Sequence, residues 1–342
     1  MADALLRDAL GTIVSRQDLD TGTARTVMDR IMAGEATPAQ IGAILAALRS
    51  KGETIDELTG MVQSMRDHAT RVELKVAAVD TCGTGGDGAG TFNISTAAAL
   101  VAAGAGCPVA KHGNRAQSGR CGSADVLEAL GVTIALSAEG VVRCIDEAGI
   151  GFLFAPAFHP AMRHAAAPRN ELGIRTAFNI LGPLANPARV RHQALGVGEA
   201  AMAAKMAEVL RRLGHRRALV FAGHGGIDEL GLDGPSACYE VTPAGVRPFT
   251  VDPAGLGLAA APVSALRGGG ATENAARIRD VLGGQTGPAR DVVLLNAAAA
   301  LVAAERAATL GEGIPLAVRS IDSGEATVRL EALIAVSREV SA

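Results

Sequence analysis

Residues 76–103 read VAAVDTCGTGGDGAGTFNISTAAALVAA, and the architecture of the chain follows from this stretch. The apolar run 76–79 predicts a short strand that ends at Asp80, and the Ala-rich run 96–103 predicts a helix. Glycines and small polar residues fill the connection between the two runs, as is typical of a loop. A strand, a glycine loop and a helix in this order predict an α/β fold with a largely parallel sheet.

The alternation of strands and helices continues toward the C-terminus. Toward the N-terminus, the pattern is helical from residue 4 to about residue 71, without a strand signal. We therefore expect a small all-helical N-terminal domain, residues 1–72, and a larger α/β domain, residues 73–342. Further strands are predicted at residues 108–110, 152–154, 193–197, 218–222 and 239–241, and further helices at 137–148, 199–213, 272–282, 288–308 and 324–340.

Composition excludes several classes of protein. Lys and Arg total 32 against 35 Asp and Glu, a net charge of −3, so no basic excess is available for binding nucleic acid. Hydrophobic residues make up 49% of the 342 positions, which excludes a mainly disordered chain. The longest apolar runs are too short for a bilayer, and charged residues interrupt the N-terminus where a secretory signal needs an apolar run. The five cysteines form no Cys-x-x-Cys pair, so we expect free thiols in a cytoplasmic protein.

Four segments carry side chains suited to chemistry, and the first is the glycine loop. Gly83, Gly85 and Gly86 let backbone amides approach an anion closely, and the hydroxyl and amide side chains that follow lead into a helix N-terminus. This context favours a phosphate-binding loop over a chance cluster in a glycine-rich chain. No Gly-Lys-Ser/Thr sequence follows the glycines, which argues against a P-loop nucleotide site.

The second and third segments supply cations and histidines. Lys111-His112-Gly113-Asn114-Arg115 follows the strand predicted to end at residue 110, where crevices form in open α/β sheets, and it suits a phosphorylated ligand. The alternative is an ordinary charged surface loop. In the third segment, Arg169 or Arg175 could clamp a carboxylate, and His159 is either a site residue or a buried structural histidine.

The fourth segment is the acidic pair Asp228-Glu229, in a glycine loop after the strand predicted at 218–222. Two adjacent carboxylates suit Mg²⁺, which binds one or two carboxylates together with substrate phosphates. Taken alone, an acidic pair on a loop is more often simply solvated. Beside a bound pyrophosphate the pair would repel it, and a bridging cation removes that conflict. We therefore interpret the pair as a magnesium site.

Taken together, the four segments resemble the anthranilate phosphoribosyltransferase family, whose members join anthranilate to phosphoribosyl pyrophosphate (PRPP) in tryptophan biosynthesis. The resemblance covers nearly the whole chain and is most specific in residues 83–96, 111–115 and 169–184. It implies the class III phosphoribosyltransferase fold shared with pyrimidine nucleoside phosphorylases, with a helical insertion near residues 160–190 joining the N-terminal domain. It also implies a homodimer formed through the helical part, two Mg²⁺ ions per active site, and small-molecule substrates without a nucleic-acid or membrane partner.

The resemblance also assigns site residues position by position. It implies that Mg²⁺ binds Ser95, Asp228 and Glu229, and that anthranilate binds against Gly83, His112, Asn114, Arg169, His159 and Pro183. It implies that PRPP binds Gly83, Gly86, Asp87, Thr91, Asn93, Ile94, Ser95, Thr96, Lys111, His112, Gly113, Asn114, Arg115, Ala116, Gln117, Ser118, Gly119 and Ser123.

The implied reaction needs no obligatory general base. An aromatic amine is neutral and nucleophilic at pH 7, so the protein has to stabilise the departing pyrophosphate and orient the amine. Two other functions stay open at this point. A pyrimidine nucleoside phosphorylase on the same fold would need a loop of the Lys-x-Ser/Thr type in place of residues 111–115. A non-catalytic relative that binds nucleic acid is disfavoured by the net charge of −3 and by the intact motifs.

Overall fold

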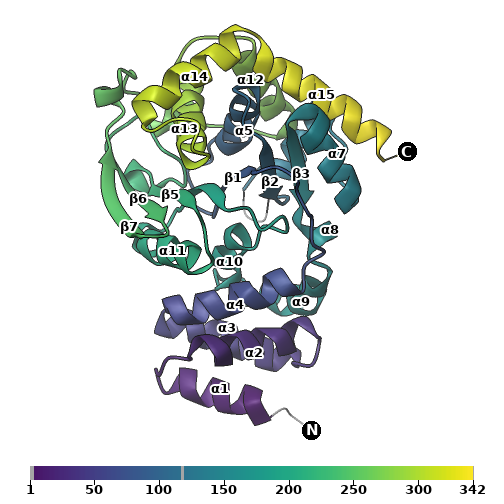
Figure 1. Cartoon of the computed structure of the whole chain (residues 1–342). Coiled ribbons are helices and arrows are strands. Elements are labelled where there is room, and N and C mark those ends of the chain that lie inside the picture. The colour runs from purple at the N-terminus through teal and green to yellow at the C-terminus, as the bar shows by residue number, and fades with distance from the viewer. Residues whose placement is uncertain (1–3, 117–118, 342) are drawn as a thin grey trace.

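The computed structural model describes residues 4–116 and 119–341, and Figure 1 shows their arrangement. Four helices form one end of the molecule: α1 (Ala4–Val14), α2 (Thr21–Met32), α3 (Pro38–Lys51) and α4 (Ile55–Asp67). The rest of the chain surrounds one sheet with helices on both faces. The predicted fold, an α/β body after a helical N-terminal part, is confirmed.

Capping side chains explain where the N-terminal helices begin. Asp20 accepts a hydrogen bond from Thr23 N at 2.9 Å in front of α2. Thr37 and Thr54 each form a capping box, in which the threonine and the residue three positions later satisfy each other's backbone N–H groups. These reciprocal bonds fix the starts of α3 and α4.

The N-terminal helices share a continuous apolar core with part of the α/β body. Buried residues of α1 to α4 pack in one cluster with α10 (Phe178–Leu184), α11 (Ala200–Arg212) and alternate residues of the neighbouring strands. Helix α9 (Arg163–Leu172) packs against α2 and α3. Helices therefore do occur near residues 160–190, between the two parts of the chain. The division at residues 72 and 73 stays a prediction.

One seven-stranded sheet has the order β3-β2-β1-β4-β5-β6-β7. The parallel strands are β1 (Val79–Gly83), β2 (Val109–Gly113), β3 (Ile150–Phe154), β4 (His192–Gly196) and β5 (Arg217–Ala222). The strands β6 (Ser236–Thr242) and β7 (Gly245–Val251) pair antiparallel at one edge. The parallel strands are in register along their length, so their carboxyl ends meet at one edge of the sheet.

Several predicted boundaries were wrong. Strand β1 begins at Val79 instead of residue 76, and it continues through Thr81, Cys82 and Gly83. Strand β7 was not predicted, because its exposed residues and Pro248 do not form an alternating apolar pattern, and proline is tolerated at a sheet edge. The helix predicted at 288–308 ends earlier, as α13 (Pro288–Ala303), and α14 (Leu310–Asp322) was not predicted.

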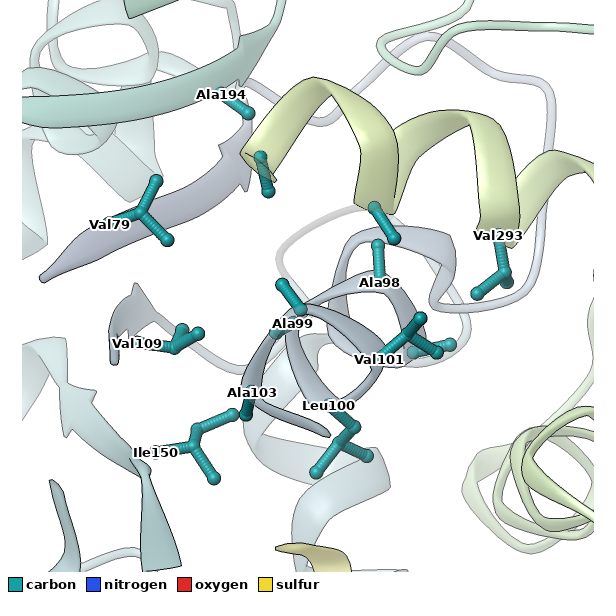
Figure 2. Packing of buried hydrophobic residues seen from close by; sticks show 14 of the residues in the cluster. Val79, Ala98, Ala99, Leu100, Val101, Ala103, Val109, Ile150, Ala194 and Val293 are labelled. Carbon is teal, nitrogen blue, oxygen red and sulfur yellow. The ribbon is translucent and has the colours of Figure 1, made fainter. Parts of the chain in front are cut away.

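Helix α5 (Ile94–Gly104) is central to the larger core, and Figure 2 shows it between the strand residues Val79, Val109 and Ile150 and Val293 of α13. Its alanines allow close packing on both sides, and a Cβ at Gly104 would collide with the backbone of α15 (Glu325–Glu339). The cysteines are free thiols, as predicted. No helix in the described ranges is long and apolar enough to cross a membrane.

Replacing Leu100 by Ala should lower the free energy of unfolding by ~2–5 kcal/mol, because this fully buried side chain leaves a cavity in the centre of the core. Urea denaturation measures the change. The matched control is Val328→Ala on α15, whose side chain is 54% exposed, and it should change the value by less than ~0.5 kcal/mol. Similar changes in both variants would contradict the central role of α5.

Candidate active site

The glycine loop leaves β1 at Gly83 and turns before it reaches α5. Gly85 and Gly86 have φ values of +65° and +70°, a left-handed conformation that residues with a side chain rarely adopt. Gly83 is glycine for a different reason, because a Cβ there would collide with the carboxylate of Asp228. The glycines therefore shape the loop and admit an acidic side chain at its base.

The loop after β5 returns over the strand ends and brings Asp228 to the glycine loop. Asp228 Oδ2 accepts a hydrogen bond from Gly85 N at 2.6 Å, and Asp228 N donates to Asp87 Oδ2 at 3.3 Å. At the end of β4, a Cβ on Gly196 would collide with the backbone of Asp228, so this approach needs another glycine. Residues 143 positions apart are thereby joined at one edge of the sheet.

Glu229 joins the same acidic loop to the start of α5. Its Oε1 accepts a hydrogen bond from Ser95 N at 3.0 Å, a favourable position because helix N-termini carry unpaired N–H groups and a partial positive charge. Helix α5 begins at Ile94, slightly before the predicted start, and this places Ser95 in its first turn. On the other side of the loop, Asn296 of α13 exchanges two hydrogen bonds of 3.0 Å with the backbone of Leu230.

Lys111 lies close to Ser95 but belongs to the sheet. The sequence predicts a loop from residue 111 onward, whereas β2 continues through Gly113 and pairs Lys111 with Phe152 of β3. This prediction was wrong because polar residues at the end of a strand give no apolar signal. Lys111 is buried; its Nζ donates to Thr81 O and lies 3.4 Å from Ser95 Oγ.

Burial and repulsion act strongly on the acidic pair. Burial, followed by the charge of Asp87, raises the pKa of Asp228 to about 7. Burial and the charge of Asp228 raise the pKa of Glu229 well above its usual value, although the ammonium of Lys111 opposes this. Burial also lowers the pKa of Lys111, despite the carboxylates around it. The site therefore holds more acidic groups than one lysine can neutralise, which favours binding of a further cation.

A second group of predicted residues meets at the end of β2. The ring centroids of His112 and His159 lie 5.2 Å apart, and both side chains are buried. Burial lowers the pKa of His159 to about 4 and that of His112 well below its usual value, so both rings are neutral near pH 7. Neither Nε2 atom has a hydrogen-bond partner among the residues that the structure describes. The pair forms an uncharged surface with unused polar atoms.

Sequence reasoning missed the buried network behind these histidines, which centres on Asp80. Asp80 Oδ1 accepts a hydrogen bond from His112 N at 3.1 Å, and its Oδ2 accepts one from Asn186 Nδ2 at 2.8 Å. Gln193 Nε2 lies 3.4 Å from the same Oδ2 and donates to Pro183 O at 2.7 Å. The network links the strand that carries His112 to the helix that carries Pro183. An acid at the end of an apolar run was the available signal, but its side-chain partners Asn186 and Gln193 lie more than a hundred residues away.

Arg169 is a cation without a counter-ion in the described part of the chain. It is half-buried on α9, and its guanidinium has no hydrogen bond or ion pair within the ranges 4–116 and 119–341. Burial lowers the pKa of Arg169, and no carboxylate opposes this effect. A partly buried guanidinium that lacks a described counter-ion is suited to binding an anionic ligand.

Arg115 has different surroundings, since it is bound by Asp125 and Glu128. Its charge is therefore already neutralised within the chain. The neighbouring Gln117 and Ser118, which the resemblance assigns to PRPP, lie outside the described residues. Ala116 N is held by the carboxylate of Asp125 at 3.0 Å.

The segment that follows β2 folds back onto the glycine loop. Asn93 Nδ2 donates to Cys121 O at 3.1 Å, and Ser123 Oγ at the start of α6 (Ser123–Leu130) donates to Asn114 O at 3.3 Å. The first of these bonds joins two of the predicted donor segments, and the second lies within the segment that follows β2. Of the other predicted donor residues, Ile94 and Thr96 are buried in α5, and Thr91 forms a β-bridge with Arg267.

Comparison with known proteins agrees with this arrangement. Residues 75–327 match the a/b domain of a glycosyl transferase family, and residues 7–69 match the helical bundle domain of a glycosyl transferase family. An anthranilate phosphoribosyltransferase from Chloroflexus aurantiacus is 58% identical, over 97% of this chain and 99% of the relative. One from a Roseiflexus species is 57% identical, over 97% of this chain and 98% of the relative.

Solved structures of such enzymes are also similar. The anthranilate phosphoribosyltransferase from Thermus thermophilus has a TM-score of 0.92 and 46% identity, over 97% of this chain and 99% of its own. The enzyme from Saccharomyces cerevisiae in complex with PRPP and Mg has a TM-score of 0.89 and 28% identity, over 98% of this chain and 99% of its own. The chain belongs to the anthranilate phosphoribosyltransferase family.

Proposed function

We propose that the chain transfers the phosphoribosyl group of PRPP to the amine of anthranilate, giving N-(5-phosphoribosyl)anthranilate and pyrophosphate. This is a pentosyltransferase reaction of tryptophan biosynthesis. The observation that carries the proposal is that Asp228 and Glu229 bind the backbone of the glycine loop and of the α5 N-terminus. Amides suited to an anion and carboxylates suited to a metal therefore occupy one place, as a diphosphate leaving group requires.

The donor would bind along the glycine loop, the first turn of α5 and the segment after β2. Backbone N–H groups of these elements would bind the diphosphate, with the ammonium of Lys111 beneath them. The side chain of Arg115 is occupied by two acids, so it would contribute through its backbone. Thr91, Asn93 and the other donor residues assigned above complete this part of the proposal.

The residues present fit Mg²⁺. Asp228 and Glu229 are adjacent oxygen donors whose raised pKa values reflect charge that Lys111 does not fully offset. In the part of the chain that the structure describes, no group of three or more His, Cys, Asp or Glu could hold a metal alone, so substrate phosphates would supply further ligands. Ser95, Asp228 and Glu229 would hold the ion, which supplies positive charge to the departing pyrophosphate. The number of two ions per site is also part of the proposal.

Arg169 would bind the carboxylate of the acceptor, because its half-buried guanidinium has no counter-ion in the described chain. A related yeast structure contains 4-fluoroanthranilate. His112 and His159 would present neutral rings to the acceptor, with Gly83, Asn114 and Pro183 beside them. Since the amine is nucleophilic without a strong base, these residues would act by orienting it toward the ribose.

Other parts of the proposal rest on the family resemblance. They are a homodimer formed through the N-terminal helices, a cytoplasmic location and the domain division at residues 72 and 73. A pyrimidine nucleoside phosphorylase and a nucleic-acid-binding relative are not favoured, because relatives that are 53% to 58% identical are anthranilate phosphoribosyltransferases.

The direct test follows the fluorescence of anthranilate in the presence of the chain. We expect the signal to fall only when PRPP, Mg²⁺ and anthranilate are all present, because the leaving group needs the cation and the amine needs the donor. Omission of each component in turn is the control. Release of free base from thymidine or uridine with phosphate, without loss of anthranilate, would support the phosphorylase instead.

The double variant Asp228→Asn, Glu229→Gln should abolish turnover and leave the chain folded. The amide oxygens can still accept the hydrogen bonds from Gly85 N and Ser95 N, but they bind Mg²⁺ poorly. The assay described above measures turnover, and circular dichroism measures folding. Global unfolding of this variant would count against the assignment.

The same variant has a predictable pH dependence of stability. Because the folded-state pKa of Asp228, about 7, is above the usual 3.8, the unmodified chain loses stability as the pH rises between these values. Without added metal, the variant should therefore be the more stable form at pH 8, and the difference should shrink toward pH 4. Urea denaturation at the two pH values checks this.

Arg169→Ala should raise the KM for anthranilate by about tenfold or more and change the KM for PRPP little, because it removes a charged hydrogen-bond donor to the acceptor carboxylate. Arg169→Lys keeps the charge but not the planar guanidinium, so its KM for anthranilate should lie between those of the unmodified chain and of Arg169→Ala. Steady-state kinetics with each substrate varied in turn gives both constants. An unchanged KM for anthranilate would show that Arg169 does not bind the acceptor.

A further inference from the structure

Arg175 lies in the short linker between α9 and α10 and has no place in the reaction described above. Gly173 ends α9 with a left-handed φ of +62°, and Thr176 N donates to Asn179 Oδ1 at 3.0 Å at the start of α10. Helix α9 packs against α2 and α3, and α10 packs against α4. Both ends of the linker are therefore fixed to the helical part of the molecule.

From this linker, the Arg175 side chain reaches the glycine loop. Its Nη1 donates to Gly85 O at 2.9 Å, and its guanidinium covers Gly86, where an added Cβ would collide with Nη1 and Cζ. At the same time, Gly85 N donates to the carboxylate of Asp228. Both polar backbone groups of Gly85 are thus bound, one by the helical side and the other by the acidic loop.

The charge of Arg175 is not neutralised by a carboxylate of the described residues. It has no ion pair with any described residue, in contrast to Arg115, which two carboxylates bind. A guanidinium without an ion pair among the described residues, placed beside the glycine loop, adds positive potential where the diphosphate is proposed to bind.

The glycine loop also needs an external constraint. Glycine has the widest conformational freedom of any residue, so ordering successive glycines during binding is unfavourable. A contact that already holds Gly85 and Gly86 in their left-handed conformations reduces the ordering that the donor must impose.

We propose that Arg175 is a positioning residue that holds the glycine loop in its donor-binding conformation and links this loop to the segment that carries Arg169. The two arginines then have separate tasks, since Arg169 is free for a ligand and Arg175 is bound to the loop. This inference rests on the proposed function, but it concerns donor affinity, which can be measured without turnover.

The first test is calorimetric titration of the chain with PRPP and Mg²⁺ in the absence of anthranilate. Arg175→Ala should weaken binding about tenfold and raise the KM for PRPP similarly, while the KM for anthranilate changes less than about twofold. Arg175→Lys retains one hydrogen-bond donor, so its affinity for PRPP should fall only about threefold. The matched control is Arg163→Ala, which replaces an exposed arginine at the start of α9. It should leave the PRPP affinity and both KM values unchanged.

The second test uses the collision at Gly86. Gly86→Ala should weaken PRPP binding sharply, because the new methyl group displaces the guanidinium and strains the backbone. Arg175→Ala makes room for that methyl group, so the double variant should bind about as well as Gly86→Ala alone instead of showing the product of both losses. Thermal melting establishes which variants fold. If Gly86→Ala does not fold, the PRPP affinities of the Arg175 variants alone decide the inference.

Two results from the variants overturn the inference: a PRPP affinity of Arg175→Ala within about twofold of the unmodified chain, or losses in the double variant that multiply independently. If the unmodified chain binds PRPP but forms no product, the proposed function fails while the titrations still decide the role of Arg175. An unmodified chain that does not bind PRPP overturns both.

Discussion

The site depends on two carboxylates that bind backbone N–H groups of distant segments. Asp228 holds Gly85 N in the glycine loop, and Glu229 holds Ser95 N in the first turn of α5. These bonds need close approach between main chains, which is available because glycine lines β1 and β4 at their carboxyl ends. One acidic loop therefore sets the relative position of the two elements that are proposed to bind the diphosphate.

The same interaction leaves the site electrostatically incomplete. Burial raises the pKa of both acids, the charge of Asp87 adds to this at Asp228, and the buried Lys111 offsets only part of the charge. Groups with strongly shifted pKa values cluster at functional sites, where a bound ligand can supply the missing charge. On the acceptor side, Arg169 has the opposite imbalance, because it is a cation without an acidic partner among the residues that the structure describes. The excess of acidic groups at Asp228 and Glu229 suits a metal-bound diphosphate, and the positive charge of Arg169 suits the carboxylate of the acceptor.

Sequence reasoning located the loops but not the contacts between them. The glycine loop and the acidic pair were recognisable because their residue types have special backbone or ligand chemistry. The boundaries of β1 and β2 were misplaced, because the strand ends carry polar residues such as Thr81 and Lys111 that are paired by the sheet and give no apolar signal. The network around Asp80 and the contact of Arg175 join segments about ninety or more residues apart, and only the folded chain brings them together.

The proposed acceptor site draws its residues from two layers of the molecule, because Gly83, His112 and Asn114 lie with the donor loops in the α/β body. The donor loops leave the strand ends of the α/β body, whereas His159, Arg169 and Pro183 lie on the α8 (Ala155–Phe158) to α10 segment, parts of which pack on the N-terminal helices. An amine can attack the ribose only if these layers keep their spacing within a fraction of an ångström. The shared apolar core sets the spacing coarsely. Polar bonds across the boundary, from Gln193 to Pro183 O and from Arg175 to Gly85 O, have the directionality needed to fix it more finely.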